Sequence, residues 1–254
     1  MALSIRNTGN EFMVQCMTSA SAIAHSLDLD ALNRRFETAT PQDILRWAIR
    51  TFPTGLAQTN SFSIPVTVHM LYAELCPPRR VPVIFLDTLH HFEETLATAE
   101  RARQRYDLDL HVYQAAGATT RQEFANRYGD ELWQRDIDQF HYLTKVEPLQ
   151  RALQAVEVRA WVTGRRRDQS ATRQAMPILE ADSDGRLKIN PLANWTRKDL
   201  WGYVFQHNVI YNPLHDRGYA SIGDEPLTTP VQPGEDERAG RWRGSAKTEC
   251  GIHL

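Results

Sequence analysis

Short apolar runs alternate with amphipathic segments through the middle of the chain. The clearest run is 81–87 (VPVIFLD), which is almost entirely apolar and rich in β-branched residues, as expected for a strand buried on both faces. Further strands are predicted over 108–115 and 159–164, and a weaker one over 55–62. Strands that alternate with helices are typical of parallel sheets. The pattern therefore predicts an α/β fold, with a mostly parallel central sheet flanked by helices.

The helices begin at recognisable signals. Thr40 precedes a proline and an acidic first turn, which predicts a helix that runs to about Phe52. Another helix is expected to begin at Thr196, three residues before Asp199. A third covers 92–106, which is rich in Glu, Ala and Arg. The helix over 92–106 lies between two predicted strands, and the other two lie before the first strand and after the last.

The two ends of the chain differ from its middle. Residues 1–25 have polar residues where a signal peptide would have an apolar core, so we expect a poorly ordered leader there. The nucleotide-binding α/β domain is assigned to 26–230. Residues 231–254 are rich in Gly, Pro and charge and are expected to form a mobile C-terminal catalytic tail. No stretch approaches the ~20 apolar residues of a membrane helix, which indicates a cytoplasmic protein with no membrane partner.

Composition excludes several classes of protein. The 254 residues include 29 Lys and Arg against 31 Asp and Glu, a net charge of -2, too balanced for a protein that coats nucleic acid. The three cysteines form no CxxC pair, which argues against a disulfide framework, a zinc finger and a four-cysteine iron–sulfur site. The adjacent His90 and His91 lack the i, i+4 spacing of zinc ligands. We therefore predict an enzyme of a reducing compartment with no metal site.

The densest basic cluster follows the strand predicted over 159–164. It contains Arg165, Arg166, Arg167 and Arg173, with Gln169 and Ser170 between them. Ligands of open parallel sheets bind at the carboxyl ends of the strands, and guanidinium groups match phosphate and sulfate oxygens. The segment is thus a candidate oxyanion site; the alternative is a solvated basic loop with affinity for RNA.

Polar residues follow two other predicted strands. The N–H and O–H groups of Thr59, Asn60 and Ser61 can cradle a phosphate, although a plain helix N-cap explains them as well. Asp87 and Thr88 place a carboxylate and a hydroxyl where a nucleotide would lie, with an Asx-type turn as the alternative. Both segments lie where a parallel sheet binds its ligand.

Cys250 is the most distinctive single residue. It lies in the polar tail with Lys247 three residues before it, and nearby cations favour the thiolate, whereas the adjacent Glu249 opposes it. Cys76 follows an apolar helix and is expected to be a buried structural thiol, and Cys16 lies in the leader. Cys250 is therefore the candidate nucleophile.

Six blocks in order resemble one family, the thioredoxin-dependent 3′-phosphoadenylyl sulfate (PAPS) reductases of assimilatory sulfate reduction. The blocks are NSF at 60–62, LDTLHHFEET at 86–95, KVEPL at 145–149, GRRRDQSATR at 164–173, YNPLHDRGYASIGD at 211–224 and KTECGIH at 247–253. By itself Lys145 beside Glu147 would be called a surface ion pair. The ordered set, with ECGIH near the end of the chain, is what identifies the family.

The resemblance implies an adenine nucleotide α-hydrolase-like fold and a specific reaction. The tail cysteine would attack the sulfonate sulfur of PAPS, release adenosine 3′,5′-bisphosphate and carry a Cys–SO₃⁻ thiosulfonate. Thiols of reduced thioredoxin or glutaredoxin would then free sulfite. A homodimer without a bound cofactor is expected.

The resemblance also assigns roles to residues of this chain. Cys250 would be the nucleophile, framed by Glu249 and His253. Substrate binding would fall to Thr59, Asn60, Ser61, Asp87, Thr88, Lys145, Arg166, Arg167, Gln169, Ser170 and Arg173. Arg165 stands where the family more often has an apolar residue, so its removal is expected to have a mild effect.

The chain departs from the family pattern at two positions. Ser63 and Leu89 stand where many members have glycine. Because glycine often permits a positive φ, these positions bear on the geometry of the two polar loops.

A sister group that reduces adenylyl sulfate (APS) carries two cysteine pairs that ligate an iron–sulfur cluster. This chain has Phe140, His141, Asp224 and Leu227 in those regions, so no cluster is expected and PAPS is favoured over APS. An ATP pyrophosphatase of the same superfamily would show a Gly-Gly-x-Asp-Ser loop. An RNA-binding module and an inactive homologue remain the alternatives outside this chemistry.

Overall fold

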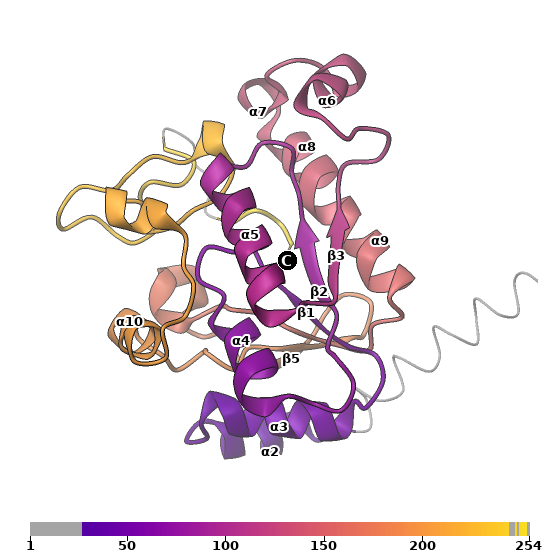
Figure 1. Cartoon of the computed structure of the whole chain (residues 1–254), viewed down its shortest axis with the longest axis vertical. Helices are drawn as coiled ribbons and strands as arrows, with labels where there is room; N and C mark the ends of the chain where they lie inside the picture. The colour runs from indigo at the N-terminus through magenta and orange to yellow at the C-terminus, as the bar shows by residue number, and fades with distance from the viewer. Residues whose placement is uncertain (1–26, 244–246, 248, 253–254) are drawn as a thin grey trace, which may run out of the picture.

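The computed structural model describes residues 27–243, 247 and 249–252 (Figure 1). Within this part of the chain six strands form one sheet in the order β3-β2-β1-β4-β6-β5, with every neighbouring pair parallel except β5 and β6. The strands are β1 (Leu56–Thr59), β2 (Val83–Leu86), β3 (Leu110–Tyr113), β4 (Ala160–Val162), β5 (Leu179–Ala181) and β6 (Leu187–Ile189). The prediction of a mostly parallel sheet is confirmed.

The main helices begin where the sequence places them. Thr40 accepts a hydrogen bond from the backbone N–H of Asp43 at 3.2 Å, and Thr196 and Asp199 cap the other predicted helix reciprocally. The helices are α2 (Leu29–Phe36), α3 (Pro41–Thr51), α4 (Val66–His69), α5 (Glu93–Tyr106), α6 (Arg121–Tyr128), α7 (Leu132–Arg135), α8 (Ile137–His141), α9 (Glu147–Ala155) and α10 (Arg197–Gln206). Two π-helical segments, η1 (Met70–Leu75) and η2 (Tyr142–Val146), continue α4 and α8, and short 3-10 turns occupy Arg167–Gln169, Ala171–Arg173, Pro213–Arg217 and Glu225–Leu227.

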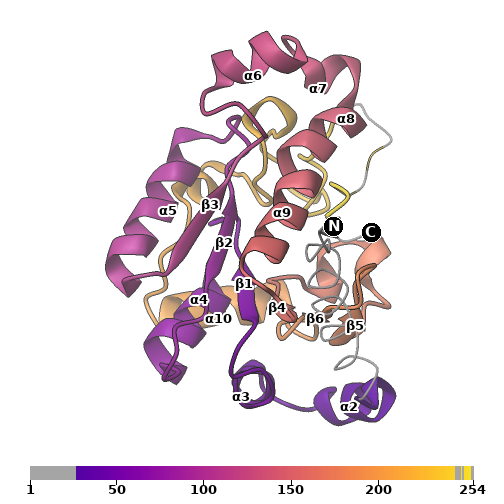
Figure 2. The ribbon, with the colours of Figure 1, turned by 90° about the vertical axis from the view of Figure 1, so that its right-hand side faces the viewer.

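Helices cover both faces of the sheet. Val83 and Phe85 of β2 pack with Ala99 of α5 on one face. Ile84, between them in sequence, packs with Leu149 of α9 on the other, as expected because alternate side chains of a strand point to opposite faces. Figure 2 shows α5 and α9 on opposite sides of the strands. Burial on both faces explains the nearly continuous apolar run of β2.

The strand order reverses beside β1. Gln58 of β1 lies opposite Val83 of β2 on one side and Val162 of β4 on the other. The chain adds β2 and β3 on one side of β1 and then returns to add β4 on the other side. The crevice at the carboxyl ends of strands where the order reverses is where open α/β sheets bind ligands. The fold therefore brings the loops after β1, β2 and β4 to one place.

A π-helical turn interrupts the helical run from α8 to α9. Pro148 lacks an N–H and cannot donate an α-helical hydrogen bond to the carbonyl of Thr144, and the chain widens into η2 just before it. Lys145 lies in this turn and is buried. Such π-bulges are frequent at functional sites.

The segment expected to be a mobile tail is packed against the body in its described part. Trp242 is 2% exposed, and its indole N–H donates to Nε2 of His141 at 3.3 Å. A Cβ on Gly240 would lie 2.0 Å from the carbonyl oxygen of Thr229, so the two backbones can approach only because this residue is glycine. The glycine content of this segment thus permits a close backbone contact, and its charged residues form ion pairs within the protein, such as those of Glu237 and Arg238.

No helix in the described ranges is long and apolar enough to cross a bilayer.

Candidate active site

A cavity of about 250 Å³ lies at the carboxyl ends of β1, β2 and β4. Its lining includes polar residues after each of these strands and cations from segments far apart in the sequence. These cations are Lys145, Arg165, Arg166, Arg173, Arg238 and Arg241. The arrangement suits a ligand with several negative charges, since guanidinium forks pair with phosphate and sulfate oxygens.

The loop after β1 brings Thr59, Asn60 and Ser61 to the cavity, as predicted. Asn60 Oδ1 accepts a hydrogen bond from the backbone N–H of Phe62 at 2.7 Å, which closes a tight turn. The left-handed residue of this turn is Phe62, with φ 52°, and its side chain is fully buried. Ser63 is not among the positive-φ residues and its Oγ lies 2.9 Å from Nε2 of His215, so a side chain is accommodated where the family usually has glycine.

Of the two residues after β2, Thr88 lines the cavity and is fully buried. Asp87 does not line it: its carboxylate accepts hydrogen bonds from the backbone N–H of Leu89 at 2.9 Å and from Gln114 at 2.8 Å. Asp87 therefore forms the Asx-type turn that was the alternative interpretation. Leu89 holds φ 61° in this turn, the left-handed conformation that glycine adopts without strain.

The arginine loop after β4 divides between the cavity and the protein body. Arg166 is 2% exposed, and its guanidinium pairs with Asp168 and Glu237, each at 2.8 Å. Burial raises the pKa of Glu237, which Arg166 opposes. Arg165, expected to matter little, lines the same cavity and pairs with Glu180. Arg165 and Arg166 together give this wall its positive charge.

Arg167 is placed away from the cavity, contrary to the prediction. Its guanidinium makes two hydrogen bonds to Glu37, at 2.8 and 2.9 Å, and its Nε donates to the carbonyl of Met176. Arg166 is extended and Arg167 begins a 3-10 turn, and the two side chains diverge: Arg167 ties the loop to the end of α2 while Arg166 lines the cavity. Ser170 also lies outside the lining and pairs with Thr172, whereas Gln169 is part of the lining.

Lys145 enters the cavity wall from the π-helical turn. Its ammonium pairs with Asp224, whose side chain is fully buried and lies 3.6 Å from Nε2 of His141. Burial would raise the pKa of Asp224, but Lys145, His141 and His91 outweigh it and hold that pKa well below its usual range. Burial lowers the pKa of His141 to about 4. Asp224 is therefore a fixed negative charge that orients Lys145.

Arg238 and Arg241 are cavity residues that the sequence analysis missed. Their guanidinium groups lie over the indole of Trp242, 5.1 and 4.6 Å from the ring centroid. Burial lowers the pKa of Arg238 to about 10 and also lowers that of Arg241, although the charge of Cys250 works in the opposite direction on both. Both remain cations near neutral pH. Trp242, an apolar residue flanked by Arg241 and Arg243, was the available signal that this segment is packed.

Cys250 lies in the wall of the same cavity and is partly exposed. Arg173 makes a bidentate ion pair with Glu249, with both contacts at 2.8 Å, and Arg238 contacts the same carboxylate at 3.3 Å. Burial would raise the pKa of Glu249, but Arg173 and Arg238 hold it below its usual value. Glu249 therefore anchors the residue next to the thiol; His253, expected to frame it on the other side, lies outside the described residues.

Cys76 is exposed, so the prediction of a buried structural thiol is wrong. It follows the π-helical turn η1 with φ 41°, and this left-handed residue directs the chain toward Pro77 at the surface. Cys76 does not line the cavity, and Cys16 lies outside the described residues. Cys250 is the cavity thiol in the described part of the chain.

The chain is similar to known proteins over most of its length. The family model for the phosphoadenosine phosphosulfate reductase domain matches residues 56–230. The phosphoadenosine phosphosulfate reductase of Emericella nidulans is 47% identical over 229 residues, which cover 89% of this chain and 74% of that protein. The adenosine 5′-phosphosulfate reductase of Salinibacter ruber is 44% identical over 232 residues, 90% of this chain and 89% of that protein.

Among solved structures, the chain is similar to the phosphoadenylyl-sulfate (PAPS) reductase of Candida auris in its phosphate complex. The two share 40% sequence identity with a TM-score of 0.71, over 80% of this chain and 96% of that one.

Proposed function

This chain belongs to the phosphoadenosine phosphosulfate reductase family, and on that basis we propose how its cavity reduces PAPS to sulfite and adenosine 3′,5′-bisphosphate. The observation that carries the proposal is the position of Cys250 in a cavity wall that also holds six cationic side chains, Lys145, Arg165, Arg166, Arg173, Arg238 and Arg241. PAPS carries about four negative charges, and neutralising them is a precondition for a thiolate to approach.

In the first step the Cys250 sulfur attacks the sulfonate sulfur of PAPS. The bond between that sulfur and the bridging phosphate oxygen breaks, and adenosine 3′,5′-bisphosphate leaves with the bond's electron pair. The protein keeps a Cys250–SO₃⁻ thiosulfonate. Arg238 and Arg241 line the same cavity as Cys250, so their positive charge lies where the anionic leaving group develops.

In the second step a dithiol reductant resolves the thiosulfonate. One thiolate attacks the Cys250 sulfur and releases sulfite, and the resulting mixed disulfide is resolved by the second thiol, which returns Cys250 as a thiol. Two electrons pass from the dithiol to the sulfonate sulfur, and the donor becomes a disulfide. The partial exposure of Cys250 supports access by a protein donor, and we propose thioredoxin or glutaredoxin in that role.

The cation set supports a division of labour in binding. Lys145, Arg166 and Arg173 bind the phosphate and sulfate groups, together with the loop of Thr59, Asn60 and Ser61, which lines the same cavity. Thr88 lies toward the nucleoside. Compared with the binding residues assigned from sequence, the proposed set gains Arg165, Arg238 and Arg241, which line the cavity, and loses Arg167, which does not.

We also propose that the enzyme works without an iron–sulfur cluster. Thiolates are the usual ligands of such a cluster, whereas Phe140 is a fully buried part of a small apolar core and Asp224 is committed to Lys145. Because a relative at 44% identity is named for adenosine 5′-phosphosulfate, the preference for PAPS is part of the proposal. A cytoplasmic homodimer completes it, on the strength of the family resemblance.

The test is sulfite release from PAPS and from APS, with reduced thioredoxin or glutaredoxin as donor. Faster turnover of PAPS per unit enzyme supports the proposal, and equal or faster turnover of APS would contradict the substrate assignment. No sulfite from either substrate would favour an inactive homologue. Light scattering of the same sample checks the dimer.

A further inference from the structure

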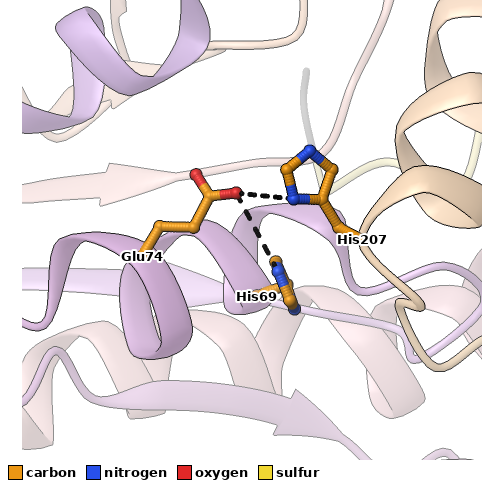
Figure 3. Close-up of side chains that lie close together, drawn as sticks. All are labelled: His69, Glu74 and His207. Atoms are coloured by element: carbon orange, nitrogen blue, oxygen red, sulfur yellow. Dashed lines mark ion pairs between the residues drawn. The ribbon is translucent and has the colours of Figure 1, made fainter.

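Two histidines and a glutamate meet away from the reaction cavity, where the end of α10 packs against η1 (Figure 3). Oε1 of Glu74 lies 3.3 Å from Nδ1 of His207 and 3.9 Å from Nε2 of His69. The three donor atoms all lie within 4.8 Å of one another. None of the three residues lines the cavity that holds Cys250.

The π-helical geometry of η1 makes this meeting possible. His69 ends α4 and Glu74 lies five residues later inside η1. In a regular α-helix residues five apart point about 140° away from each other, since each residue turns ~100°. A π-helix bonds residue i to residue i+5 and returns the two side chains to one side. His207 then reaches them from the C-cap of α10.

Neighbouring hydroxyl and amide groups hold two of the three side chains in position. The hydroxyl of Tyr106 lies 3.1 Å from Nδ1 of His69, which leaves Nε2 toward Glu74. Tyr203 donates to Oε1 of Glu74, and the same ring stacks on His207 with centroids 4.1 Å apart. Gln42 donates to Oε2 of Glu74 at 3.0 Å. Hydrogen bonds of this kind orient ligand side chains in metal sites.

The chemistry of the three donor groups suits a cation as well. Two imidazoles and one carboxylate are a common ligand set for Zn²⁺.

We propose that His69, Glu74 and His207 form a binding site for Zn²⁺ or a similar first-row divalent ion, separate from the reductase site. Zinc bonds of ~2.0–2.1 Å place neighbouring ligand atoms of a tetrahedron about 3.3–3.4 Å apart. The 3.3 Å separation of Glu74 and His207 matches this value, and the 3.9 Å separation of Glu74 and His69 needs a small closure. Three protein ligands leave a fourth position for water, which the partial exposure of Glu74 and His207 permits.

Such an ion would connect two segments that lie far apart in the sequence. His69 and Glu74 belong to the helical segment after the phosphate-facing loop, and His207 to the end of α10. The folded chain presents all three ligands together and the unfolded chain does not, so a bound ion stabilises the fold.

The test uses the full-length protein, stripped with a chelator and with its thiols alkylated so that cysteines do not bind the metal. Titration calorimetry with Zn²⁺ should give one ion per chain, and Co²⁺ should give the absorption of a tetrahedral nitrogen and oxygen site. Removing a ligand by His207→Ala or Glu74→Gln should weaken binding by at least the ~10- to 100-fold seen when only an outer partner is lost. Tyr203→Phe, which removes that outer partner, should fall within the same range.

His111→Ala is the matched control, because His111 is also a partly exposed histidine paired with a carboxylate, Asp109 at 3.0 Å. It should bind Zn²⁺ like the parent. Absence of saturable binding, or equal binding by the His207 and Glu74 variants and the parent, would overturn the proposal. Circular dichroism checks that each variant is folded. If His207→Ala does not fold, the comparison of Glu74→Gln with the parent decides the outcome. Sulfite assays play no part in this readout, so the metal site and the reductase assignment can fail independently.

Discussion

Two arginines of the same loop, Arg173 and Arg167, provide a controlled test of which charges bind the nucleotide. Each makes a two-contact ion pair with a glutamate at 2.8–2.9 Å, Arg173 with Glu249 and Arg167 with Glu37. The pairs differ in position, since Arg173 lines the cavity and Arg167 does not. Changing each to alanine removes the same chemistry from two places.

The expected loss follows from the kind of bond that is removed. A hydrogen bond between a guanidinium and a charged phosphate or sulfate contributes ~1.5–3 kcal/mol. Since about 1.4 kcal/mol is a factor of ten, Arg173→Ala should weaken binding of adenosine 3′,5′-bisphosphate about 10- to 100-fold. Arg167→Ala should stay within about two-fold, because its partner Glu37 lies outside the site. Arg173→Lys should recover only part of the loss, since an ammonium cannot form the bidentate fork.

The assay is calorimetric titration of adenosine 3′,5′-bisphosphate into the three variants and the parent at one ionic strength. Urea unfolding of each variant separates loss of binding from loss of stability. Equal, small losses for Arg173→Ala and Arg167→Ala would refute the reasoning, because they would mean that a diffuse basic surface attracts the nucleotide. A larger loss for Arg167→Ala would show that the loop is arranged differently in solution.

Three further predictions concern the thiol, iron content and acid stability. Cys250→Ser should abolish sulfite formation with bisphosphate binding within a few-fold, and Cys76→Ser should remain active; a dead Cys76 variant instead would contradict the mechanism. The purified protein should contain no stoichiometric iron or acid-labile sulfide by elemental analysis, because Phe140 and Asp224 supply no thiolate. Because the pKa of His141 falls from 6.5 to about 4 on folding, the unfolded chain binds more protons between these pH values, and the free energy of unfolding should fall by about 3 kcal/mol as pH drops through this window. Urea unfolding of His141→Asn should show a flatter pH dependence there, and an unchanged slope would refute the assignment.

The strands and helices that the sequence predicts are those with an unambiguous local pattern. β2 is nearly all apolar, and helices α3, α5 and α10 have capping or charge signals at their ends. β5 and β6 were not predicted because each is three residues long with a charged residue at its centre, Glu180 or Lys188, whereas the equally short β4 is entirely apolar. Their burial comes from contacts with α2 and β4, which no local window contains.

The candidate site was predictable where its residues follow strands. Thr59 and Arg166 face the cavity because the carboxyl ends of parallel strands meet there. Whether a neighbour such as Arg167 faces the same way depends on the loop conformation, which residue type alone does not determine. Lys145 is a different case, since a π-helical turn before Pro148 directs it inward. The only sequence feature that indicates this turn is the proline itself.

The C-terminal segment contains both Cys250, the proposed nucleophile, and two of the cavity cations, Arg238 and Arg241, an arrangement that would couple binding to attack. Arg173 and Arg238 hold Glu249, and Glu249 is bonded to Cys250 along the chain. An anion that binds Arg173 competes with Glu249 for the same guanidinium, so substrate binding and the placement of the thiol draw on one set of charges. Composition hides this coupling, because a charged, glycine-rich segment has the same residue content whether its charges face water or one another. The two cases are distinguished by Trp242, since a large apolar side chain between arginines is stable only where the segment around it is packed.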